Sequence, residues 1–174
     1  SEGVADEMRR DSRQLRQNDT FGLMLDTFYD RRNGLTFYTN PLGAIADFET
    51  TNEGNPNSDW NPVWDVRTGR FDGGWTVEME IPFKSLRYQP GETQAWGIQL
   101  RRIVRRRNEA AYLTALPISA ARGNSVIAGL WRVSEAATLV GLEVPPLSID
   151  VEIKPYGMAG LRTDVNADPP TEND

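Results

Sequence analysis

Apolar and polar residues alternate along much of the chain with the two-residue period of a β-strand. The clearest run is Gly-Trp-Thr-Val-Glu-Met-Glu-Ile at residues 74–81, in which four apolar side chains face one way and polar ones the other. No repeat and no long helical period is found. Further strands are expected at 20–28, 35–40, 44–49, 64–71, 95–104 and 109–116, with short ones at 125–130, 137–142 and 148–154.

Turn-forming residues separate these runs at intervals of about 8–15 residues. Asn33-Gly34 is expected to supply the positive φ of a hairpin turn, and Asp72-Gly73-Gly74 forms a second turn. This pattern predicts an all-β fold, an antiparallel β-sandwich of jelly-roll or immunoglobulin-like type with short helical turns. One helical turn is expected at 83–86.

The start of the chain is polar and predicts only a surface element. Residues 7–17 could form a short helix after an Asp11 or Ser12 cap, with Met8 and Leu15 as its only apolar side chains.

The composition excludes several kinds of chemistry and points to none. The 174 residues carry a net charge of −6, which disfavours nucleic-acid binding, and they contain no Cys and no His. Thiolate and imidazole catalysis are therefore absent, and any metal would be a hard ion such as calcium held by oxygen ligands. Only Lys84 and Lys154 among the 19 basic residues are lysines. The arginine-rich run 101–107 is interpreted as a solvated face or an anion-facing rim. No apolar run approaches the roughly 18 residues of a transmembrane helix.

Three segments together resemble a known family of binding domains. Residues 18–28 (Asn-Asp-Thr-Phe-Gly-Leu-Met-Leu-Asp-Thr-Phe) are similar to a strand of family-9-like carbohydrate-binding modules. Residues 74–86 resemble that family's GWTxExxIPxxxL strand and turn, and residues 96–102 resemble its WxxNxxR strand. The resemblance covers about residues 5–160.

Other segments resemble a bacterial subgroup of that family, in which the module precedes an uncharacterised outer-membrane-barrel-like domain. These segments are 8–12, 29–34 and 147–156. The resemblance implies a sandwich at 1–144 that lacks its N-terminal part, and a linker with the start of a barrel-like domain or tail at 145–174. It also implies a location outside the cytoplasm, in the periplasm or at the outer membrane of a Gram-negative-type bacterium.

Sugar rings stack on aromatic side chains while nearby polar groups bond their hydroxyls. The candidate ligand-binding residues are Trp60, Trp64, Tyr38, Asn40 and Arg102, the last by its match to a family arginine that contacts sugar hydroxyls. Three alternatives stay open. Trp64 is in phase with Val66 and could be a core residue, Trp60 could be a core residue as well, and Arg102 could pair with Glu78 or Glu80. Trp75 and Trp96 are expected in the core, in phase with other strand hydrophobes.

Oxygen-rich turns suggest a structural calcium site, because family members often carry one. The candidate ligands are Asp26, Asp30 and Asn33, with the loop 52–59 as a weaker candidate; the alternative is turn capping. Glu78 and Glu80 are close enough on one strand for a pair of glycosidase carboxylates. Their alternation is explained more simply by a solvent-facing strand.

The leading hypothesis is a non-catalytic domain that binds a glycan or polysaccharide by aromatic stacking and polar contacts. The alternative is a protein-interaction or scaffold module that docks on a membrane-associated protein partner without binding sugar. A glycosidase is the least favoured function, and no nucleic-acid partner is expected.

Overall fold

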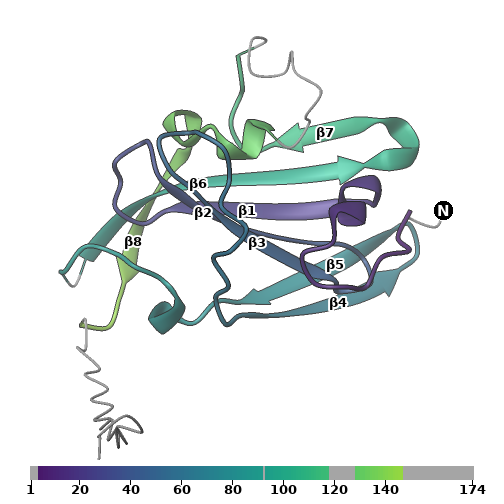
Figure 1. Ribbon diagram of the computed structural model, residues 1–174, viewed down its shortest axis with the longest axis horizontal. Coiled ribbons are helices and arrows are strands. Elements are labelled where there is room, and N and C mark those ends of the chain that lie inside the picture. Colours follow the sequence, from purple (N-terminus) through teal and green to yellow (C-terminus); the bar gives the residue numbers. More distant parts are fainter. Residues whose placement is uncertain (1–3, 92, 118–127, 147–174) are drawn as a thin grey trace, which may run out of the picture.

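The computed structural model describes residues 4–91, 93–117 and 128–146, and this part of the chain is all-β with antiparallel pairing (Figure 1). The predicted fold class, an antiparallel sandwich with short helical turns, is confirmed. The strands are β1 (Thr20–Asp26), β2 (Gly34–Thr39), β3 (Ile45–Thr50), β4 (Asp65–Phe71), β5 (Gly74–Glu80), β6 (Thr93–Val104), β7 (Glu109–Tyr112) and β8 (Ala137–Glu143). Short 3-10 turns lie between them: η1 (Arg13–Gln17), η2 (Phe83–Ser85), η3 (Arg105–Arg107), η4 (Ala128–Trp131) and η5 (Val133–Glu135).

The larger sheet has the strand order β3-β2-β1-β6-β7, and β8 pairs with the other half of β6. Consecutive hairpins join β1, β2 and β3, and β6 then returns beside β1 through a long connection, as in a Greek key. That connection contains the second sheet, the hairpin of β4 and β5. Figure 1 shows this hairpin lying under the large sheet, with its turn at the same end as the start of β1 and the end of β6.

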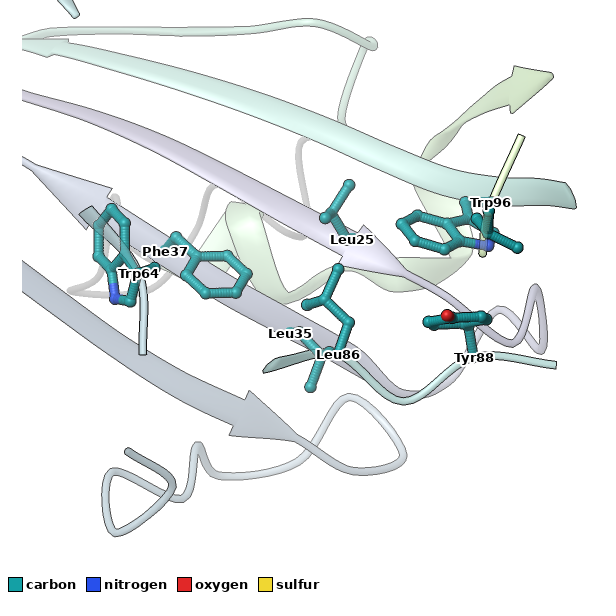
Figure 2. Packing of buried hydrophobic residues seen from close by; sticks show 8 residues of the cluster. Leu25, Leu35, Phe37, Trp64, Leu86, Tyr88 and Trp96 are labelled. Atoms are coloured by element: carbon teal, nitrogen blue, oxygen red, sulfur yellow. The ribbon is translucent and has the colours of Figure 1, made fainter. Parts of the chain in front are cut away.

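One face of the large sheet packs against the hairpin and the segment that follows it. Its buried cluster joins Leu25 and Phe37 to Trp64, Leu86 and Trp96 (Figure 2). Trp96 is 2% exposed, which confirms its predicted place in the core. Most of the aromatic pairs in this layer lie edge to face, an arrangement that adds to the stability gained from burial alone.

The opposite face of the large sheet is buried as well. Met24, which alternates with the core residues of β1, is fully buried against Leu130 and Val133 of η4 and η5. The expected surface helix of the N-terminal segment is instead the 3-10 turn η1, whose cap Ser12 accepts a hydrogen bond from the backbone N–H of Gln14. Its Leu15 is fully buried with Tyr38 and Phe48, so the segment covers this face of the sheet.

The turn between β1 and β2 differs from the prediction in its backbone. Positive φ occurs at Tyr29 and Arg31, and not at Asn33 or Gly34. The carboxylate of Asp30 accepts hydrogen bonds from the backbone N–H groups of Arg32 and Asn33, each at 2.8 Å. The turn is therefore held by side-chain acceptors rather than by the conformational freedom of glycine.

Toward the C-terminus the sandwich ends with β8, and Val144 is buried in the main cluster. The predicted strand at 148–154 and nearly all of the segment 145–174 lie outside the described residues, as does the first half of the predicted strand at 125–130. The second half of that prediction is wrong, because residues 128–130 belong to the 3-10 turn η4. Within the described ranges, no helix is long and apolar enough to cross a membrane.

Candidate ligand-binding site

The two tryptophans of the predicted platform have separate environments. Trp64 is 6% exposed, packs edge to face on Phe37 at 5.2 Å, and donates its indole N–H to Asp47 at 2.9 Å. Trp64 is therefore a core residue, the alternative that was left open because Trp64 and Val66 lie on the same face of the strand. Trp60 also packs on Phe37, at 5.5 Å, and is partly buried. A stacking platform made of both rings is not formed.

The partner of Trp64 is a buried carboxylate with a structural role. Asp47 is 1% exposed and also accepts a 2.6 Å hydrogen bond from Arg10 of the N-terminal segment. Burial raises the pKa of Asp47, although the hydrogen bond from Trp64 and the charge of Arg10 oppose that rise. The arrangement ties the N-terminal segment to β3 and to the start of β4.

Tyr38 and Asn40 lie inside the protein. Tyr38 is 6% exposed, and burial raises its pKa. Asn40 is fully buried: its amide donates to the backbone carbonyl of Glu7 and to Asn18, and its oxygen accepts from two backbone N–H groups. All the bonding capacity of this amide is used within the protein, so no group is left for a ligand.

Arg102 is exposed and lies where the two sheets separate. On the large sheet it pairs with Phe21 across β6 and β1. It faces the tip of the β4–β5 hairpin, and two adjoining hollows of about 300 and 330 Å³ share Arg102, Phe71 and Trp75 in their walls. Phe21 and Val77 complete the apolar lining of one hollow. We refer to the two together as the hairpin cleft.

The hairpin cleft exists because the apolar core stops before the tip of the hairpin. Val66 and Met79 pack on the main cluster, whereas Trp75 lies outside it and is only partly buried. Phe71 is 61% exposed, and its ring lies over Gly74, where a Cβ would come within 2.5 Å of the ring. Glycine at 74 therefore lets the ring of Phe71 lie across the hairpin.

The alternation along β5 predicts Trp75 in the core, and the structure places it in the wall of the cleft instead. Phe71 and Arg70 were not among the candidate residues. The turn Asp72-Gly73-Gly74 is the sequence feature that could have indicated them. Residues next to a tight hairpin turn lie at the end of a two-stranded sheet, where the fewest neighbouring residues bury them.

A separate hollow of about 520 Å³ is lined by Trp60. Its wall includes Phe28, which is 43% exposed, together with Glu49, Lys84 and Arg87. We refer to it as the Trp60 groove. The structure therefore places Trp60 and Arg102, the two ligand-binding candidates that reach one of these hollows, in different ones.

The candidate metal ligands hold the turn between β1 and β2. Asp26 is fully buried and accepts from the backbone N–H groups of Asp30 and Arg31; burial raises its pKa despite these bonds. Burial acts in the same direction on Asp30, but hydrogen bonds from the backbone of Asn33 and Arg32 and from the Asn33 amide outweigh it and lower the pKa. These contacts are the turn capping that the sequence left as the alternative.

In the 52–59 loop, Asn57 exchanges two backbone hydrogen bonds with Glu49. Among residues 4–91, 93–117 and 128–146, no group of three or more acidic side chains converges as a metal site would require.

Glu78 and Glu80 are exposed on the outer face of β5, opposite Arg67 and Asp65 of β4. This is the solvent-facing strand that the alternation predicts. In the described part of the chain, neither glutamate forms an ion pair with Arg102.

No family model, curated protein or solved structure matches this chain.

Proposed function

We propose that this protein is a non-catalytic carbohydrate-binding domain whose ligand lies in the hairpin cleft. The observation that carries the proposal is the exposed Arg102, which has no partner among the described residues, beside two accessible aromatic rings, Trp75 and Phe71. Sugar recognition needs this combination, because the C–H face of a pyranose packs on an aromatic ring while its hydroxyls bond to planar donors.

The walls of the cleft support the same function. Trp75 and Phe71 come from a hairpin whose strands are fully paired, and Arg102 comes from the interior strand β6, so regular sheet positions all three residues. A site built on strands requires little ordering when the ligand binds, which lowers the entropic cost of association. The volume of each hollow is at the lower end of the range for small-molecule sites and suits one or two sugar rings.

Affinity electrophoresis through gels that contain a panel of polysaccharides tests this proposal. The wild-type protein should be retarded by at least one polysaccharide, and Trp75→Ala and Arg102→Ala should each lose most of the retardation. Arg67→Ala is the matched control, because Arg67 is an exposed arginine on the outer face of the same hairpin.

Two other results would redirect the proposal. Loss of retardation in Trp60→Ala, with Trp75→Ala unaffected, would move the site to the Trp60 groove. No retardation of the wild-type protein by any polysaccharide would reject carbohydrate binding, and co-purification with one stoichiometric protein would then favour a scaffold function.

A further inference from the structure

The hairpin cleft is lined by an unusual number of arginines for a chain with a net charge of −6. Arg70 of β4, Arg102 of β6 and Arg106 of η3 all contribute to its wall. They come from three separate elements, so their gathering is a property of the fold and not of the arginine-rich run 101–107 alone.

These arginines have no carboxylate partner within the described residues. The ion pairs found there use Arg9, Arg10, Arg107 and Arg132, and none uses Arg70, Arg102 or Arg106. The neighbouring Arg107 pairs with Glu109 at 3.9 Å and is not part of the cleft wall. The structure therefore separates the paired arginines from those that face the cleft.

Two carboxylates also line the cleft, and they do not cancel the positive charge of the three arginines. Asp19 is 5% exposed, and its two oxygens accept hydrogen bonds from the backbone N–H groups of Val4 and Arg105. Asp72 is exposed at the tip of the hairpin. Three guanidinium groups thus face one solvated and one internally bonded carboxylate, and this local excess favours an anionic ligand.

We propose that the ligand of the hairpin cleft is an anionic glycan, whose carboxylate or sulfate groups are bound by Arg70, Arg102 and Arg106 while a sugar ring packs on Trp75. This inference rests on the proposed carbohydrate-binding function and names the class of its ligand. The planar guanidinium group binds carboxylate and sulfate oxygens with two parallel hydrogen bonds, which gives both affinity and orientation.

The test compares glycans that share a backbone and differ in charge. Polygalacturonate is compared with its methyl ester, and dextran sulfate with dextran, by affinity electrophoresis at low and high salt. The expected result is retardation by at least one charged member of a pair and little by its neutral form, with retardation that weakens as salt rises. Which charged glycan binds identifies the source of the anionic group, carboxylate or sulfate.

Arg70→Gln and Arg106→Gln should each weaken the retardation by about tenfold, because each removes a charge-assisted contact. Arg67→Gln changes the net charge equally from the opposite face of β4 and should bind like the wild type.

Equal retardation by charged and neutral forms, or wild-type binding by Arg70→Gln and Arg106→Gln, would overturn the inference. The proposed function would stand if Trp75→Ala still abolished binding. Single-stranded DNA that retards the protein as strongly as the glycan does would also overturn the inference, in favour of a non-selective polyanion site. No retardation by any glycan would instead reject the proposed function.

Discussion

At the scale of single residues, burial decides which polar side chains belong to the fold and which are available to a ligand. Arg101 and Arg102 show this most directly, because they are adjacent and alternate across β6. Arg101 is 2% exposed beneath η4, with Nε and Nη1 lacking hydrogen-bond partners in the described residues, and burial lowers its pKa to about 10. Arg102 points the other way into the cleft.

Glu7 is a second buried charge, and its bonding makes it stabilising. The carboxylate accepts hydrogen bonds from the side chain of Arg9, from Ser12 and from the backbone of Arg9 and Met8, which together lower its pKa from 4.5 to about 2. A carboxylate with a lowered pKa in the folded state adds stability above the unfolded pKa and loses it as the pH falls through the folded pKa.

Glu7→Gln should therefore lower the free energy of unfolding at pH 7, and its difference from the wild type should narrow as the pH falls from about 4.5 to about 2. Urea denaturation of both proteins at pH 7, 4 and 3 measures this difference. In Arg9→Ala the acid-induced loss of stability should be smaller and should be complete at a higher pH, because removing the largest cause of the lowered pKa brings the folded-state pKa closer to the unfolded value of about 4.5. A difference that stays constant over the whole pH range would contradict the prediction.

At the scale of elements, the 3-10 turn η4 seals the second face of the large sheet. Leu130 is fully buried against β1, and a Cβ placed on Gly22 would lie 2.8 Å from its Cδ2 atom. Such a contact requires a neighbour to shift, and a fully buried leucine has no free space to move into. Close packing of η4 on β1 thus depends on glycine at position 22.

Gly22→Ala should cost about 1–3 kcal/mol of unfolding free energy, and Leu130→Ala about 2–5 kcal/mol. In the double variant the cost of the alanine at 22 should largely disappear, because the shortened side chain at 130 leaves room for the new methyl group. Urea denaturation of the four proteins gives the coupling energy. As a control, Gly22→Ala combined with Leu113→Ala should be additive, since Leu113 is 50% exposed. Additive costs for positions 22 and 130 would show that η4 does not pack on β1 in solution.

The alternating pattern was sufficient to predict the strands of this fold but not which segments pack on the two faces of the sheet. It located β1 to β8 to within a few residues, apart from the shorter β7, because strand period and turn residues are local signals. It left open what covers the second face of β1, where Gly22, Met24 and Asp26 are all buried. The segments that bury this face are residues 4–19 and 128–136. They contact strand residues that are far away in the sequence, and such contacts leave no local periodicity.

The candidate site was less predictable than the fold, and for a related reason. Trp64, Tyr38 and Asn40 have residue types suited to sugar binding, but they are buried in contacts with Asp47, Phe48 and Asn18 that no spacing reveals. Arg102 was proposed from a family resemblance and does reach a cleft. Trp75 was assigned to the core by its phase. Periodicity reports which face of a strand a side chain occupies, and not whether another layer reaches that far along the strand.

At the scale of the whole molecule, the sandwich is closed at one end and open at the other. The closed end is filled by Phe83, Tyr88 and Trp96, with ring centroids about 6 Å apart. At the open end, Trp75 and Phe71 face Phe21 and Arg102 across the hairpin cleft. Apolar burial stabilises the fold at the closed end, while the aromatic surface at the open end remains accessible.

This division predicts that alanine substitution of two tryptophans will have different effects, one mainly on stability and the other mainly on binding. Both tryptophans alternate in phase with the apolar residues of their strands. Trp96→Ala should lower the free energy of unfolding by about 3–5 kcal/mol, because it empties a site that is 2% exposed and removes two aromatic contacts. Trp75→Ala should cost only about 1 kcal/mol, because its ring is partly exposed and lies outside the main cluster.

Urea denaturation measures both costs, and glycan binding by the folded variants supplies the second readout. We expect Trp75→Ala to lose binding while it keeps nearly wild-type stability, and Trp96→Ala to lose stability while its folded fraction still binds. A stability loss in Trp75→Ala as large as that in Trp96→Ala would show that the two sheets close over Trp75 in solution, as the alternation along β5 first suggested. The hairpin cleft would then not be open to a ligand, and the binding site would have to be sought in the Trp60 groove.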